Sequence, residues 1–157
     1  MAFTFVRGAG ANVDPAVVSM YASGVVHVNG VVVLETPVGS DSATLSRVAP
    51  GGSGARTTSV FGVCLDYAQG ASDTIVRVIP FVPGMLWEAD AVNAWGTVQA
   101  GKFHQLYSDL QLNNTSYNHT GGAGVFLVYN VVETTGSIKV IGEFVRAKVT
   151  PQSTVGT

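Results

Sequence analysis

The sequence has few charged residues, and they are scattered. Of its 157 residues only 11% are charged, eight basic and ten acidic, where about a quarter is usual. The basic residues stand singly, so the chain has no electrostatic footprint for nucleic acid. A hydrophobic share of 46% beside so little charge indicates that partners cover much of the surface.

Cysteine is almost absent. Cys64 stands alone, which excludes an intrachain disulfide and a cysteine-based metal site. It sits in the apolar run Val60–Leu65, where a small buried thiol fits a strand. The three histidines fall on separate segments without metal-ligand spacing, so we expect no metal and no cofactor. His27 alternates out of a run of valines and is predicted to lie at the surface or an interface.

Long hydrophobic runs are missing as well. The longest, Val125–Val132, contains Asn130 and is far shorter than the roughly 18 apolar residues that a membrane-spanning helix needs. No basic segment followed by an apolar one marks a secretory signal. We therefore expect no membrane partner and synthesis in the cytoplasm.

The motifs of enzymes are incomplete. Ser59 and Ser72 lack the Gly-x-Ser-x-Gly elbow of hydrolases, and Gly8–Val13 begins like a dinucleotide-binding loop but lacks its third glycine. Glu88 and Asp90 would share one side of a strand, yet no third acidic or histidine partner is near, which favours a solvated face. We predict that the protein is not an enzyme; a trimeric β enzyme such as a nucleotide hydrolase is the least supported alternative.

What the chain does contain is a series of β-rich runs between glycine-rich turns. Helical periodicity is weak, with at most one helical turn near Pro15–Met20. The pattern predicts an all-β fold of seven to ten strands, a single-domain β-sandwich or small barrel. The predicted strands are Phe3–Arg7, Val25–Val28, Val31–Leu34, Val60–Leu65, Thr74–Phe81, Leu86–Ala91, Tyr107–Leu112, Val125–Glu133 and Ile138–Lys148.

Two turns are predicted between these runs. Asn29-Gly30 accepts positive φ at both central positions of a type I′ turn, so Val25–Leu34 is predicted to form a tight hairpin. The polar stretch Gln69–Asp73 is predicted to be a turn that separates two strands.

The N-terminal 20 residues carry more alanine, glycine and polar residues than a core element, and are predicted to form an extended arm (1–20). A β domain (21–150) and a flexible tail (151–157) follow. Phe3, Phe5 and Arg7 alternate along one strand, so an edge strand could present them to a partner. The alternative is that both phenylalanines complete the core of their own subunit.

Trp87 and Trp95 are the other candidate contacts. Tryptophan dominates the hot spots of interfaces, so either residue could anchor a partner or a neighbouring subunit. Core packing at the end of a strand is an equally ordinary role for Trp87. The small, polar neighbours of Trp95 favour a contact.

Structural glycines and apolar alternation recur over residues 60–146. This pattern resembles the capsid decoration (cement) proteins of tailed bacteriophages, although little before Gly62 matches it. The motifs are Val63…Ala68-x-Gly70, Val76-Arg77-Val78-Ile79-Pro80, Pro83-Gly84-x-x-Trp87-Glu88-Ala89, Gly96-x4-Gly101-Lys102 and Gly142-Glu143-Phe144.

The resemblance implies a β-rich fold, often trimeric and sometimes described as a β-tulip. It implies a virion protein that binds the major capsid protein on the outer surface of the capsid and stabilises the expanded head, with Ala2–Val13 as the arm that reaches the capsid. High apolar content without charge independently favours a homotrimer or another closed ring. The alternative function is a carbohydrate-binding or adhesin-like β module of a head fibre or tail, which would use Trp95 and the Asn113–His119 loop.

Overall fold

The computed structural model describes residues 3–7, 15–35, 47–51, 60–92, 100–113, 124–133 and 138–145. These residues hold ten strands and no helix, which confirms the all-β prediction. No helix that could cross a membrane is found in these ranges. The strands are β1 (Thr4–Arg7), β2 (Val18–Val26), β3 (Val31–Leu34), β4 (Arg47–Pro50), β5 (Gly62–Cys64), β6 (Ala68–Pro80), β7 (Leu86–Asp90), β8 (Phe103–His104), β9 (Phe126–Glu133) and β10 (Lys139–Phe144).

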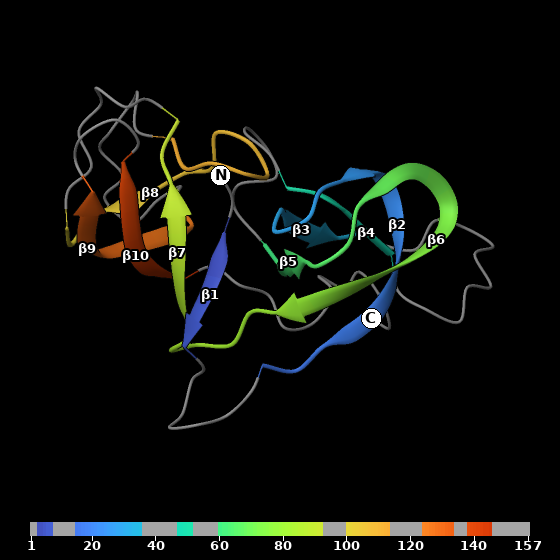
Figure 1. The fold of residues 1–157 in the computed structure, drawn as a ribbon, viewed down its shortest axis with the longest axis horizontal. Coiled ribbons are helices and arrows are strands. Elements are labelled where there is room, and N and C mark those ends of the chain that lie inside the picture. Colours follow the sequence, from blue (N-terminus) through green and yellow to red (C-terminus); the bar gives the residue numbers. More distant parts are fainter. Residues whose placement is uncertain are drawn as a thin grey trace, which may run out of the picture.

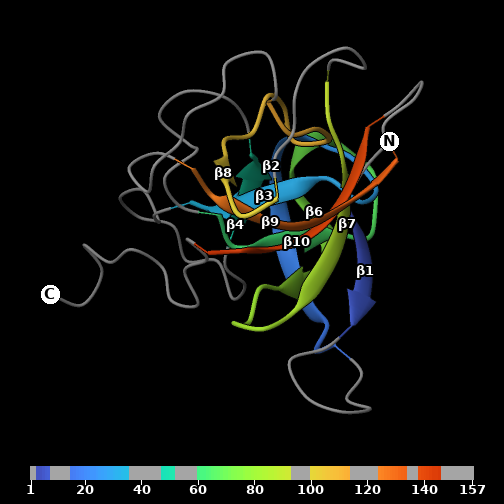
Figure 2. The same ribbon diagram turned by 90° about the vertical axis from the view of Figure 1, so that its left-hand side faces the viewer.

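The strands form two units that lie side by side (Figure 1). Strands β2, β4, β3, β5 and β6, in this order, close into a barrel on the right of the view. Strands β1, β7, β10, β9 and β8 form an antiparallel five-stranded sheet on the left. Figure 2, viewed from the left of Figure 1, has the sheet in front of the barrel.

Alternation along the barrel strands creates two cores. Val32, Cys64 and Val78 point into the barrel, where they pack with Met20 and Val48. Their neighbours in sequence point outward, because successive side chains of a strand face opposite ways. Val31, Val63 and Ile79 thereby join the core between the barrel wall and the sheet. The shared core holds the two units together as one body.

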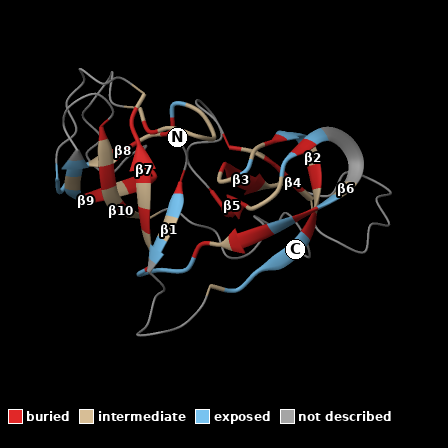
Figure 3. Ribbon diagram, in the orientation of Figure 1, coloured by how far each residue is buried: buried red, intermediate tan, exposed pale blue. Residues whose placement is uncertain are grey.

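The inner face of the sheet supplies aromatic rings to that shared core. Phe144 on β10 contacts four of them, with ring centroids 3.9 Å from Phe81, 5.0 Å from Phe126, 5.2 Å from Phe3 and 6.3 Å from Trp87. Figure 3 shows the resulting alternation of buried and half-buried residues along β7 and β10.

The predicted hairpin at Val25–Leu34 is wrong. Strand β2 pairs with β4 and β6, and β3 pairs with β4 and β5, so β2 and β3 are not partners. The turn is also shifted by one residue: Gly30 N–H donates to the His27 carbonyl, and only Asn29 of the predicted pair has positive φ (60°). The Asn29 and Gly30 backbones pair instead with Cys64 on β5, which turns the chain across the barrel.

Three smaller predictions are also corrected. Residues 69–73 are not a turn between strands: β6 continues through them, and the register with β2 shifts there because four steps on β6 oppose two on β2. The expected helical turn near Pro15–Met20 is absent, since Pro15–Val17 are irregular and β2 starts at Val18. Residues 107–112 form a loop closed by hydrogen bonds from Tyr107 and Ser108 to the Gln111 carbonyl, not a strand.

Candidate interaction surfaces

Two of the predicted contact residues lie in the core. Phe3 is fully buried and its ring packs against Phe126 and Phe144, while Trp87 is 1% exposed. Neither side chain is available to a partner in this fold, so their prediction as surface contacts is wrong. The reason is the register of β1 on β7: Phe5 lies directly opposite Trp87, so that Phe3, Phe5 and Trp87 are all on the side of the aromatic core.

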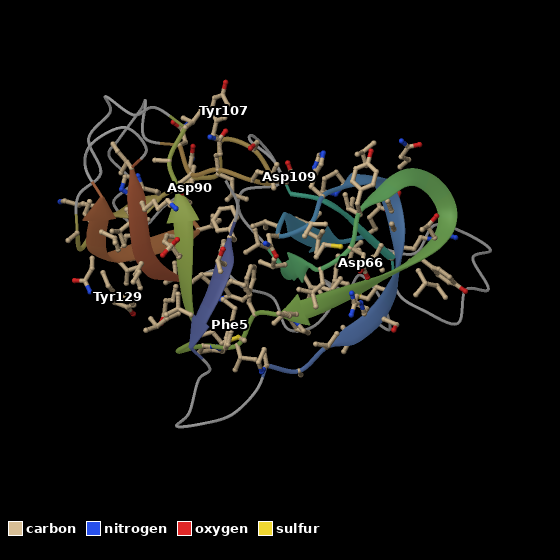
Figure 4. All side chains as sticks on the ribbon, in the orientation of Figure 1. Phe5, Asp66, Asp90, Tyr107, Asp109 and Tyr129 are labelled. Atoms are coloured by element: carbon tan, nitrogen blue, oxygen red, sulfur yellow. The ribbon has the colours of Figure 1, made fainter. Side chains whose placement is uncertain are left out.

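Phe5 is half-buried. Its ring meets that of Trp87 edge-on at 5.6 Å, and the residue packs on the shared core. Figure 4 shows Phe5 on β1, at the lower end of the sheet. The strand part of the predicted arm therefore pairs with β7 of its own chain, as the alternative prediction held.

The remaining predicted contacts are not tested by the structure. Arg7 ends β1 and is paired with Leu86, but its side chain lies outside the described residues. Trp95 lies outside them entirely, as do all residues of the Asn113–His119 loop except Asn113.

Cys64 is a structural thiol, as predicted. It is fully buried in the barrel, and its S–H donates to the Asp66 carbonyl at 3.0 Å. Burial raises the pKa of the thiol, which suppresses the reactive thiolate.

Polar chemistry concentrates at one point between the two units. His27, from the turn after β2, has its Nδ1 2.7 Å from Oδ2 of Asp109, and its ring lies 5.9 Å from that of Tyr67. Asp109 also accepts a backbone bond from Val31 through its carbonyl, so the 107–112 loop is fixed to the barrel. Figure 4 shows Asp109 between sheet and barrel. We interpret the pair as a structural link between the 107–112 loop and the barrel.

No group of three or more His, Cys, Asp or Glu side chains suited to a metal ion occurs in the described part of the chain. The Glu88 and Asp90 carboxylates do not act as one solvated pair, contrary to the prediction. Glu88 is half-buried and lies 3.8 Å from Lys139, whereas Asp90 is 5% exposed at the upper end of β7 (Figure 4).

The outside of the barrel carries a first exposed surface, the β2–β6 face, formed by Ser19, Tyr21, Arg47, Ile75 and Arg77. Tyr21 lies directly opposite Ile75 in the β2–β6 ladder and is 5.8 Å from the guanidinium of Arg47. Ile75 is 58% exposed, the highest value among the exposed large hydrophobic side chains of the described residues. A tyrosine, an isoleucine and an arginine in one row make a compact amphipathic contact area.

Arg77 borders this row and is held in one geometry. Its Nη2 donates to Oδ1 of Asp66 at 2.8 Å, and its Nε and backbone N–H donate to Oδ2 at 3.1 and 2.8 Å. The hydrogen bonds from the Arg77 side chain lower the pKa of Asp66. The bidentate pair balances the charge of Arg77 beside Tyr21 and Ile75.

The side of the five-stranded sheet that faces away from the core is the second surface, the outer sheet face. Tyr129, at the left-hand end of the molecule in Figure 4, donates its hydroxyl to Glu143, and desolvation and this bond raise the pKa of the phenol. The other members are half-buried or exposed. The apolar members of the face are Val6, Leu86, Phe103, Leu127, Tyr129, Val132 and Ile141, and its polar members are Thr4, Glu88, Asn130, Lys139 and Glu143.

Sequence reasoning missed both surfaces. Ile75 and Tyr21 become neighbours only through the β2–β6 ladder, and the predicted turn at residues 69–73 hid that pairing. A signal was present in Ile75 and Arg77, which alternate with the inward-facing Val76 and Val78.

The sequence matches no protein-family model and none of the curated proteins with which it was compared.

Proposed function

We propose that the protein is a structural component of a tailed-phage virion that binds the outer surface of the capsid and stabilises the expanded head. The partner is the major capsid protein, and the role requires no catalysis. The motifs over residues 60–146 that resemble capsid decoration proteins support this function. The all-β scaffold and the low charge of the chain are compatible with it.

The observation that carries the proposal is the β2–β6 face. Its row of Arg47, Tyr21 and Ile75 has the composition of an interface hot spot, because tyrosine and arginine are enriched at such sites. Tyr21 and Ile75 lie on the two longest strands, which are paired with each other, and Arg47 lies on the neighbouring β4. A rigid support of this kind loses little conformational entropy on binding.

A modest contact is sufficient for this role. A capsid repeats the same binding position many times, and a symmetric oligomer of the chain would engage several positions at once, so that avidity exceeds the affinity of one site. The composition predicts such an oligomer, a homotrimer in the first instance.

The test is binding of purified protein to expanded capsids and to procapsids of the phage that encodes the chain, measured by co-sedimentation. The wild-type protein is expected to saturate expanded capsids and leave procapsids largely free. Ile75→Glu places a charge in the centre of the row and is expected to weaken binding at least tenfold. Val28→Glu is the matched control, because Val28 is also an exposed aliphatic residue (50%) but lies in the turn after β2.

Two results would contradict the proposal. If the wild-type protein binds neither particle, the capsid function is wrong. If Ile75→Glu and Val28→Glu bind expanded capsids equally well, the function can stand but the β2–β6 face is not the contact.

A further inference from the structure

The outer sheet face is too apolar for an open sheet face. Antiparallel sheets that face water on one side normally alternate apolar-in with polar-out. Here Val6, Tyr129 and Val132 are exposed, and four more apolar side chains on the same face are half-buried: Leu86, Phe103, Leu127 and Ile141. Seven apolar side chains on one face of the sheet, with polar residues between them, make this face a candidate contact surface.

The charges on the central strand identify the partner. Strand β10 is the third of the five strands, and its outward residues are Lys139, Ile141 and Glu143, a cation and an anion on either side of an aliphatic residue. Successive outward residues are about 7 Å apart, so Ile141 is the midpoint between the two charges.

This arrangement is complementary to itself. A two-fold axis that lies in the contact plane, perpendicular to β10 and passing at Ile141, brings Ile141 against the same residue of a second copy. The same rotation places Lys139 opposite Glu143 of the copy, and Glu143 opposite Lys139, so two ion pairs form for one contact. Two sheets packed face to face in this way lie about 10 Å apart, which suits side chains of these sizes.

The contacts within one chain leave both charges able to pair. Lys139 Nζ is 3.8 Å from Glu88 Oε1, beyond hydrogen-bonding distance, and Glu143 accepts from the Tyr129 hydroxyl but retains further acceptor capacity. Glu88 would approach the Glu88 of the copy near the axis, and Lys139 of each chain lies beside it. Each face carries one cation, Lys139, and two anions, Glu88 and Glu143, and the two Lys139–Glu143 pairs are the attractive charge contacts between the copies.

We propose that two copies of the chain associate through their outer sheet faces, with β10 antiparallel to β10 across a two-fold axis and Lys139 paired with Glu143 of the other copy. The composition of the chain predicts that it self-associates. The proposed interface specifies which surface does so and with which symmetry, and it predicts a dimer in place of a trimer. The proposed dimer does not depend on the proposed capsid function.

The experiment is sedimentation equilibrium on the purified full chain, which has a mass of 16.3 kDa. The wild-type protein is expected to sediment with twice the mass of the chain. Lys139→Glu places two acidic residues opposite each other, and Glu143→Lys places two basic residues opposite each other, so either variant alone is expected to dissociate at least tenfold more readily. An equimolar mixture of the two variants should recover dimers that contain one copy of each, because both pairs between positions 139 and 143 are then of opposite charge.

A cysteine on the axis gives a second readout that does not depend on charge. Ile141→Cys is expected to be crosslinked to its counterpart by a short bifunctional maleimide that spans the roughly 10 Å between the sheets, whereas the exposed Val82→Cys is not; the native Cys64 is buried. The inference is overturned if the wild-type protein sediments as one chain or as three. It is also overturned if the folded single variants remain dimeric, if their mixture stays monomeric, or if both cysteine variants crosslink equally. None of these measurements involves a capsid, so their failure leaves the proposed function untouched, and the failure of capsid binding leaves the dimer untouched.

Discussion

The two cores of the molecule are built from different side chains. The barrel interior is almost entirely aliphatic, with Val, Ala, Met and Cys around one aromatic residue, Phe61. The core between barrel and sheet contains the rings of Phe3, Phe81, Trp87, Phe126 and Phe144. Six pairs of these rings meet at centroid distances between 3.9 and 6.3 Å.

Geometry explains the difference. A barrel of eight strands has an interior just wide enough for side chains, so one of five strands has room for few large side chains. Two packed sheets are separated by about 10 Å, which accommodates rings. The origin of the strands differs as well: the barrel uses the continuous stretch Val18–Pro80, whereas the sheet combines the N-terminal β1 with β7 to β10. The sheet therefore depends on contacts between distant parts of the chain.

The largest effect is expected from the centre of the ring cluster. Phe144→Ala removes the ring that contacts four others and should lower the free energy of unfolding by about 3–5 kcal/mol. Val78→Ala, at a fully buried barrel position, deletes two carbons and should cost about 2 kcal/mol. Urea denaturation of both variants measures the difference. Equal losses would show that the aromatic core is no more important than the barrel.

The N-terminal strand gives the next comparison. Phe3→Ala should cost about 3 kcal/mol because the side chain is fully buried among rings. The matched change on the same strand, Val6→Ala, should alter stability by less than about 0.5 kcal/mol, since Val6 is 46% exposed. If both variants melt like the wild type, β1 behaves as a detachable arm and its place in the sheet is not what stabilises the fold.

Two glycine substitutions, one in each unit, test whether the barrel and the sheet open independently of each other. A Cβ on Gly62 would fall on the Ile79 carbonyl oxygen inside the barrel, and one on Gly142 would fall on the Leu127 carbonyl oxygen inside the sheet. Alanine at either position must displace the neighbouring strand, at a cost of roughly 1–3 kcal/mol. Hydrogen exchange should then show faster exchange in the barrel for Gly62→Ala and in the sheet for Gly142→Ala. Identical exchange patterns would mean that the two units open together.

The strands were predictable to the extent that local pattern determines them. β1, β3, β5, β7, β9 and β10 fall within predicted runs because their alternating apolar residues are a local property. The pairing was not predictable, because Asn29-Gly30 looks the same in a hairpin and in a turn that pairs with Cys64 on a distant strand. β4 was not predicted, because its pairing with β2 and β3 depends on tertiary contacts and the local sequence does not indicate a strand.

The candidate surfaces were harder to predict for the same reason. An aromatic residue in a β-rich run can face the core or a partner, and the register decides which. Trp87 and Phe3 face the core, whereas Ile75 faces solvent, although all three stand among apolar neighbours. Exposure in a sheet alternates residue by residue, so a shift of one position reverses the assignment. The Lys139, Ile141 and Glu143 pattern acquires meaning only once β10 is known to be the central strand.

The smallest effect is expected outside both cores, at the Asp66 and Arg77 pair on the barrel. The pKa of Asp66 is lowered chiefly by hydrogen bonds from Arg77, and the pair is exposed enough for solvent to screen it. A carboxyl group whose folded pKa is depressed contributes stability above its unfolded pKa of about 3.9, and the contribution disappears as the pH falls through the folded value. Asp66→Asn should therefore unfold at slightly lower urea concentration than the wild type at pH 7, and the two curves should converge in acid. Glu35→Gln is the control, because Glu35 is an acidic residue that follows β3 of the barrel and is not part of the Asp66 and Arg77 pair. A difference between Asp66→Asn and the wild type that persists or grows as the pH falls would show that the pair acts through packing of the two side chains and not through charge.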